Sequence, residues 1–159
     1  MLRRLTSTSS SWATVPLRLA LGIAFIGHGA QKVLGSFNGP GFAKFTSFPA
    51  PFPFMRPAWL WMGAAAVSEL IGGILVLLGL FTRIGALLIA LVMLVAIFGV
   101  LWPVFFAPTG MELAVAFLGM ALALIITGGG QASVDRMIGS GGRRYETRSL
   151  ECAHVSALC

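Results

Sequence analysis

Apolar residues dominate four long runs of the chain, and short polar or proline-rich stretches separate these runs. A helix needs about 20 mainly apolar residues to cross a bilayer, and the runs have this length. None of them alternates apolar and polar positions as the strands of a membrane barrel do, and backbone groups in lipid must find partners within their own segment. The pattern therefore predicts four membrane-spanning helices, at about 15–34, 58–80, 84–106 and 111–128.

The composition supports this interpretation. Hydrophobic residues make up 57% of the 159 residues, charged residues make up 10%, and the mean hydropathy is +0.92. A soluble domain normally carries about 25% charged residues, so this chain has too little polar surface to cover a soluble globule. We expect an all-α integral membrane protein in which residues 15–138 form a four-helix bundle. The first run lacks a convincing A-x-A cleavage site, which favours a span over a cleaved signal peptide.

The basic residues indicate how the bundle is oriented. Arginines lie before the first run, at Arg83 in the turn between the second and third runs, and after the fourth run. Because Lys and Arg accumulate on the cytoplasmic side, both termini are predicted to be cytoplasmic. Topology thus accounts for the net charge of +6, and no basic stripe with interleaved aromatics suggests nucleic-acid binding. We expect residues 1–14 to be a flexible N-terminal segment and residues 139–159 a disordered tail.

The segment 35–57 is the longest connection and is rich in Phe and Pro. Its prolines exclude a regular helix from its C-terminal half, and its aromatic side chains would be costly in open water. It either anchors the helix ends as an aromatic belt at the interface or forms the wall of a lipid-accessible pocket. After the fourth run, Ser133 and Asp135 resemble a cap or turn.

Polar side chains within the predicted spans are the candidate functional residues. The first run carries Arg18, His28, Gln31 and Lys32. On a helix these side chains fall near one stripe, which indicates a face packed toward the bundle interior. An ionisable group at the bilayer centre costs at least about 3 kcal/mol, so a partner is expected. Glu69 lies near the middle of the second run, and Glu112 begins the fourth.

Depth along the helices predicts two charge-compensated layers. Glu69 is expected to pair with Arg18 or His28 near the midplane, and Glu112 with Lys32 near the outer surface. The simpler interpretation makes these pairs structural ties, with Arg18 and Lys32 extending to the two surfaces. We favour a functional pocket for Glu69 with His28, because Glu69 is too deep to reach water.

Other cofactor chemistry has little support in the sequence. Cys152 and Cys159 lie in the tail, so no metal site is expected. A single histidine in the spans cannot provide bis-His haem ligation, and the spans lack the cysteines of iron–sulfur clusters. No Gly-rich nucleotide fingerprint opens a βα unit. We therefore expect no covalently attached cofactor.

Three segments in order suggest a family. They read LRLALGIAFIGHGAQKVLG, SELIGGILVLLGLFTRIGALLIALVMLVAI and TGMELAVAFLGMALALIITGGGQASVDR. Together they resemble the DoxX family of small four-helix bacterial inner-membrane proteins. The family's recurrent polar positions then fall on Arg18, His28, Gln31, Lys32, Glu69, Arg83 and Glu112. Relatives often carry a histidine near the end of the third helix, where this chain reads GVLWPVFF.

The resemblance implies a multi-pass protein of the bacterial plasma membrane, linked to respiratory, sulfur or detoxifying redox chemistry. We expect a quinone-interacting or accessory subunit of an oxidoreductase, with quinone as the cofactor and the Phe-rich segment lining the entry of the quinone tail. Its partners would be the lipid bilayer and another subunit or a second copy of the chain. A non-catalytic scaffold subunit is the alternative, and a small proton-coupled transporter is the third. Whether the chain is itself an enzyme stays open.

Overall fold

The computed structural model describes residues 11–106 and 110–138, and all regular structure within them is helical. The flexible segment and the tail predicted from the sequence lie largely outside these residues, as do both cysteines. The helices are α2 (Thr14–Val33), α3 (Gly41–Thr46), α4 (Ala58–Leu78), α5 (Thr82–Ala96), the π-helix η1 (Ile97–Leu101) and α6 (Glu112–Thr127).

The predicted third span is the one whose end differs most from the structure. The helical segment that begins at Thr82 ends with η1 at Leu101, five residues before the predicted end at Phe106. Trp102 is extended because it precedes Pro103, whose ring disfavours helical geometry at the residue before it. In the described residues, Ala58–Leu78 and Thr82–Leu101 are long and apolar enough to cross a membrane, and Glu112–Thr127 is a shorter apolar helix.

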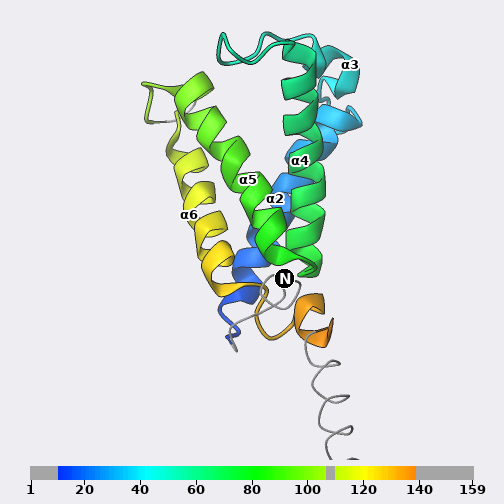
Figure 1. The fold of residues 1–159 in the computed structure, drawn as a ribbon, viewed down its shortest axis with the longest axis vertical. Helices are drawn as coiled ribbons and strands as arrows, with labels where there is room; N and C mark the ends of the chain where they lie inside the picture. Colours follow the sequence, from blue (N-terminus) through cyan, green and yellow to red (C-terminus); the bar gives the residue numbers. More distant parts are fainter. Residues whose placement is uncertain (1–10, 107–109, 139–159) are drawn as a thin grey trace, which may run out of the picture.

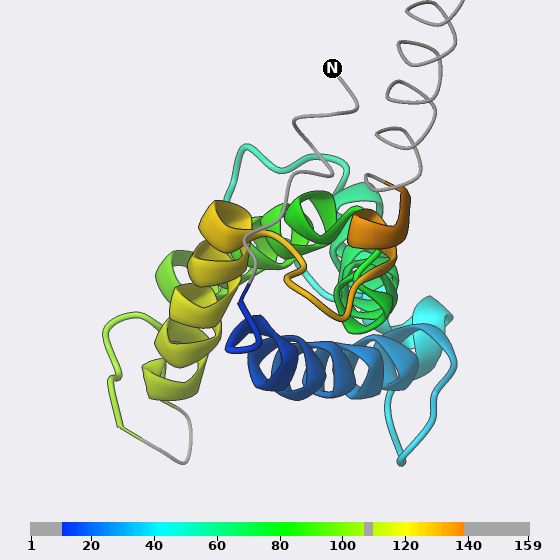
Figure 2. The same cartoon turned by 90° about the horizontal axis from the view of Figure 1, so that it is seen from below.

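The long helices form a ring in the order α2, α4, α5, α6 when viewed along their axes (Figure 2). Viewed from the side, α4 and α5 lie close together at one end and diverge toward the other, where α3 packs against α2 and α4 (Figure 1). We call these the closed end and the open end. The closed end contains the α4–α5 turn and the short helix 134–138.

Glycines set how closely the helices approach one another. A Cβ at Gly22 would lie 2.8 Å from the Cβ of Leu77, and one at Gly29 would lie 2.6 Å from the Cα of Leu70. These contacts press α2 against α4 and fix the register between the two antiparallel helices. A Cβ at Gly72 would lie 3.0 Å from the carbonyl oxygen of Gly85, which marks the close crossing of α4 and α5.

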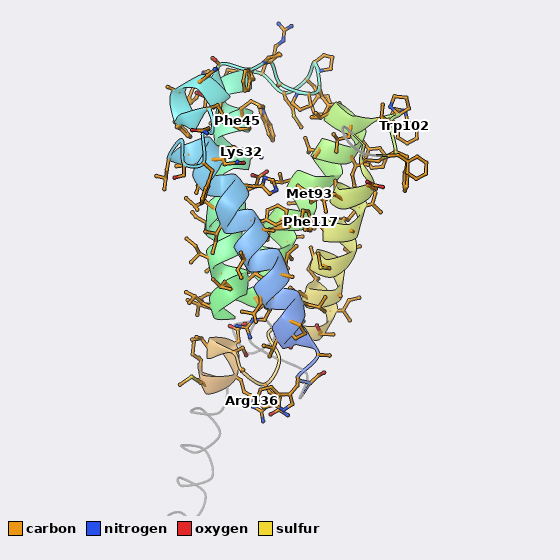
Figure 3. All side chains as sticks on the ribbon, turned by 180° about the vertical axis from the view of Figure 1, so that it is seen from behind. Lys32, Phe45, Met93, Trp102, Phe117 and Arg136 are labelled. Carbon is orange, nitrogen blue, oxygen red and sulfur yellow. The ribbon has the colours of Figure 1, made fainter. Side chains whose placement is uncertain are left out.

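The apolar core lies on the inner faces of these helices. Leu21 and Phe25 of α2 are almost fully buried, as are Ile89 of α5 and Leu124 of α6. The ring of Phe25 packs edge-on against that of Phe117, with 5.3 Å between centroids, and so links α2 to α6. Phe117 and Met93 lie between the helices at mid-height (Figure 3). These buried side chains join α2, α5 and α6 through the centre of the bundle.

Candidate functional site

The salt bridge at the open end joins Lys32 of α2 to Glu69 of α4. Lys32 Nζ donates hydrogen bonds to both carboxylate oxygens of Glu69, each at 2.5 Å. The Glu69 side chain is 2% exposed and that of Lys32 is 25% exposed. The pair corrects the predicted layers, in which Glu69 met Arg18 or His28 and Lys32 met Glu112. A buried carboxylate is therefore neutralised by a lysine whose side chain is still partly exposed.

The register between α2 and α4 explains this pairing. Gly22 faces Leu77 and Gly29 faces Leu70. The helices are antiparallel, so a residue further along α2 lies opposite an earlier residue of α4. Continuing the register brings Lys32 within one turn of Glu69. The lysine stem then spans the remaining distance along the face that α2 presents to α4.

A cavity of about 250 Å³ lies beside the salt bridge, between α4 and α5. Residues from α2, α3, α4, α5, η1 and the segment 51–55 line it. They are Lys32, Phe45, Pro51, Met55, Trp61, Met62, Ala64, Ala65, Ser68, Glu69, Leu88, Leu91, Val92, Val95, Ala96 and Val100. The close crossing at Gly72 and Gly85 closes the cavity at its inner end, and the divergence of the two helices creates its space.

The cavity wall is apolar apart from three side chains. Lys32, Ser68 and Glu69 are its polar lining residues, and they come from the neighbouring faces of α2 and α4. The ring of Phe45 lies 5.2 Å from Lys32 Nζ, close enough for a cation–π contact. In Figure 3, Phe45 lies just above Lys32 at the open end. The site thus combines an apolar wall with one cation and one anion.

The segment 47–57 covers the open end of this cavity. Pro51 and Met55 line the cavity, and a Cβ at Gly99 of η1 would lie 2.6 Å from the Cβ of Pro51. The same hypothetical Cβ would lie 2.9 Å from a ring carbon of Phe52. The segment therefore rests directly on the π-helix. Of the two interpretations of the Phe-rich connection, the pocket wall agrees with Phe45, Pro51 and Met55 lining the cavity.

Arg18 lies at the closed end and contacts carbonyl groups. Its Nε donates to the oxygen of Val76 at 3.0 Å, and its Nη2 donates to that of Leu77 at 2.8 Å. Its Nη1 donates to the oxygens of Gly129 at 3.0 Å and Ala132 at 2.6 Å. The last carbonyls of a helix have no partner within the helix, so Arg18 caps the end of α4 and ties it to the segment after α6.

Asp135 caps the start of α5 from the same segment. Its carboxylate accepts hydrogen bonds from the backbone N–H groups of Phe81 and Thr82, at 2.7 and 2.9 Å, and from the Thr82 hydroxyl at 2.9 Å. Asp135 is 1% exposed. The cap predicted at this residue is confirmed. What the sequence did not reveal is that it caps a helix more than fifty positions earlier.

The remaining candidate residues do not line the cavity. His28 is exposed, and its ring lies 6.3 Å from that of Phe25, on the stripe of α2 that also carries Lys32. Gln31 is half-buried, and its backbone packs against Gly39. Glu112 is exposed at the first residue of α6. The structure thus brings Lys32 and Glu69 together and leaves His28 out of the site.

Sequence reasoning missed Ser68 and the part of the apolar wall that α4 and α5 contribute. The available signals were the position of Ser68 beside Glu69 and the aromatic character of the segment that contains Phe45. Neither signal indicates that α5 diverges from α4 to leave a cavity. Among the described residues, no group of three or more His, Cys, Asp or Glu side chains could hold a metal ion.

Comparison with known proteins identifies the family. The DoxX family model matches residues 13–102, which are more than half of the chain and include α2 to η1 with both members of the salt bridge. Searches of curated proteins and of solved structures found no match. The family match and the two long apolar helices identify a membrane protein. The chain belongs to the DoxX family.

Proposed function

We propose that the cavity binds the head group of a quinone and that the chain acts as a quinone-interacting subunit of a membrane oxidoreductase. The observation that supports this most is the Lys32–Glu69 salt bridge in the wall of an otherwise apolar cavity between two long apolar helices. A quinone is a flat, neutral ring with carbonyl acceptors at its edge. It needs an apolar slot with a donor at one end, and the site has this combination.

The charges of the site favour a neutral ligand. Glu69 compensates the charge of Lys32, so a ligand with its own net charge would enter an apolar cavity without a counter-ion. A lysine ammonium has three donors, and one remains for a carbonyl oxygen while the others contact Glu69. Glu69 is the group placed to exchange a proton when the quinone is reduced or oxidised. Ser68 offers a second hydroxyl contact.

The size of the cavity fits a head group and not a whole tailed quinone. Ligand pockets commonly measure about 300–1,000 Å³, and this cavity, at about 250 Å³, is slightly smaller than that range. A single substituted ring would fill it. The apolar tail would then have to leave the cavity.

The proposal includes the membrane arrangement expected from the sequence. The four long helices would all span the bacterial plasma membrane, with the closed end and both termini on the cytoplasmic side. The aromatic side chains of the open end, which include the exposed Phe54, Trp59 and Trp102, suit the opposite interface. A partner subunit would supply the electron donor or acceptor, since the spans carry one histidine and no cysteine.

The test is a binding measurement on purified protein in detergent. The probe is a tail-less dimethoxy-methyl-benzoquinone, quantified by extraction after equilibration with immobilised protein. Lys32→Met and Glu69→Gln should each weaken binding by about tenfold or more, because each removes a polar contact in an apolar site. His28→Ala is the matched control, and it should bind within about twofold of the wild type.

The outcomes separate the candidate sites. Unchanged binding in Lys32→Met and Glu69→Gln, with loss in His28→Ala, would move the site back to the exposed histidine. A wild-type protein that binds no quinone, but purifies with another membrane subunit, would favour the scaffold role. Because Lys32→Met leaves Glu69 without its cation, its folding must be checked by the midpoint of thermal unfolding.

A further inference from the structure

The cavity opens on the face between α4 and α5. Its lining residues on that face are exposed: Trp61 to 45%, Leu91 to 53% and Val100 to 65%. Ala64 is exposed as well. The lining residues on the opposite side are buried or half-buried, as Glu69 and Lys32 illustrate. The exposed fractions therefore give the cavity one open side and show which helices border it.

The two helices on either side of the opening are the two long apolar helices of the described chain. They cross closely at Gly72 and Gly85 and then diverge toward the open end (Figure 1). The outward faces of both carry large exposed apolar side chains, among them Val67, Ile71 and Leu87. If α4 and α5 span the membrane, these faces contact lipid, and the opening between them leads into the hydrocarbon layer and not into water.

The other sides of the cavity are blocked. The close crossing of α4 and α5 lies at the inner end, and Lys32 with Glu69 forms the side toward α2. Pro51 and the buried Met55 cover the outer end, and this segment is pressed against η1 at Gly99. This arrangement differs from the expectation that the Phe-rich segment lines the tail entry. The segment covers the cavity, and the passage lies between the helices.

We infer that the opening between α4 and α5 is a lateral portal, bordered by Ala64, Leu91 and Val100, that selects ligands with a long apolar tail. The inference rests on the proposed quinone site. The head group would lie at Lys32 and Glu69, and the tail would pass over Leu91 into lipid. Leu91 is then a specificity-determining residue that discriminates by the tail and not by the ring.

Leu91→Trp tests the portal, because an indole at this position fills the opening. The probes are the tail-less dimethoxy-methyl-benzoquinone and the same ring with a decyl tail. We expect the variant to bind the decyl-tailed probe about tenfold more weakly than the wild type, which corresponds to losing the burial of about two methylene groups. Because Leu91 also lines the cavity, binding of the tail-less probe can fall as well, but the preference of the protein for the decyl-tailed probe over the tail-less probe should be lost.

The matched control is Leu87→Trp, one turn earlier on α5. Leu87 is exposed to 50%, close to Leu91, but it does not line the cavity. It should bind both probes as the wild type does. Ala64→Leu narrows the portal from the α4 side with less added bulk, and it should weaken the decyl-tailed probe selectively if Leu91→Trp fails to fold.

The possible failures are distinguishable. If Leu91→Trp and Ala64→Leu fold and bind the decyl-tailed probe as tightly as the wild type, the portal is wrong and the quinone site stands. If they weaken both probes equally, the added side chains reach the head group and the portal is again wrong. If the wild type binds neither probe, the proposed function fails, and the portal fails with it.

Discussion

The two ends of α2 each carry a basic residue that faces α4, and the two residues differ in their partners and in their exposure. Arg18 at the closed end is buried and donates to four carbonyl oxygens, so its donors contact only the protein's own backbone. Lys32 at the open end contacts one carboxylate and remains partly exposed beside a cavity. Arg18 is positioned to hold helix ends together, whereas Lys32 carries the donor that we propose for the ligand.

The surroundings of the two residues differ as well: Arg18 is tightly packed, whereas Lys32 lies beside a cavity. At the closed end, Gly79 adopts a left-handed conformation with φ +69°, and a Cβ there would lie 2.5 Å from Arg18 Cζ. Asp135 completes the network by capping α5, where it accepts hydrogen bonds from the backbone N–H groups of Phe81 and Thr82. At the open end, α4 and α5 separate. Polar groups that lack spare bonding capacity stabilise a fold, and polar groups beside an apolar cavity are candidates for binding.

The largest expected effect is on stability at the closed end. Arg18→Met removes every donor and leaves four carbonyl oxygens to find other partners. We expect the free energy of unfolding to fall by about 3 kcal/mol or more. Arg18→Lys should recover only part of this loss, because an ammonium group lacks the planar fork of the guanidinium. Thermal unfolding in detergent measures both, and a wild-type midpoint for Arg18→Met would contradict the structural role.

A smaller effect is expected for the salt bridge at the open end. Lys32→Met leaves the buried carboxylate of Glu69 unpaired and should lower the free energy of unfolding by about 1–3 kcal/mol. The double variant Lys32→Met with Glu69→Leu should lose less than the sum of the two single variants, by about 1 kcal/mol. The double-mutant cycle is measured by thermal unfolding. Additive losses would mean that the two side chains do not interact.

The smallest expected effect on stability concerns the segment at Pro51 and Phe52, which covers the open end of the cavity. Gly99→Ala introduces a Cβ 2.6 Å from that of Pro51, so the segment 51–52 must shift, at a cost of about 1 kcal/mol. Gly119→Ala in α6 is the control, because a Cβ there meets nothing within 4 Å. The control should be neutral or stabilising by up to about 1 kcal/mol, since alanine favours a helix. Equal unfolding midpoints for the two variants would contradict the contact between Gly99 and Pro51.

The predicted helices agree with the structure because hydrophobic runs and prolines act locally. The starts predicted for the first, second and fourth spans fall within one residue of α2, α4 and α6. The partners of the charged residues were predicted less well. Depth along the span placed Glu69 level with several basic residues, and depth alone does not say which face of α2 meets α4. Glycine contacts decide this, and they favour Lys32.

By itself the sequence determined that this is an apolar, helical membrane protein of the DoxX family whose polar groups lie on α2 and α4. The helices and their polar positions follow from composition and periodicity, which local residues fix, whereas the family was indicated by the resemblance of three segments in order. Only the tertiary structure decided that Arg18 caps α4, that Asp135 caps α5 and that Lys32 meets Glu69 beside a cavity. Each of these contacts joins residues far apart in the chain. They depend on the register and crossing of packed helices, which small differences in side-chain volume set.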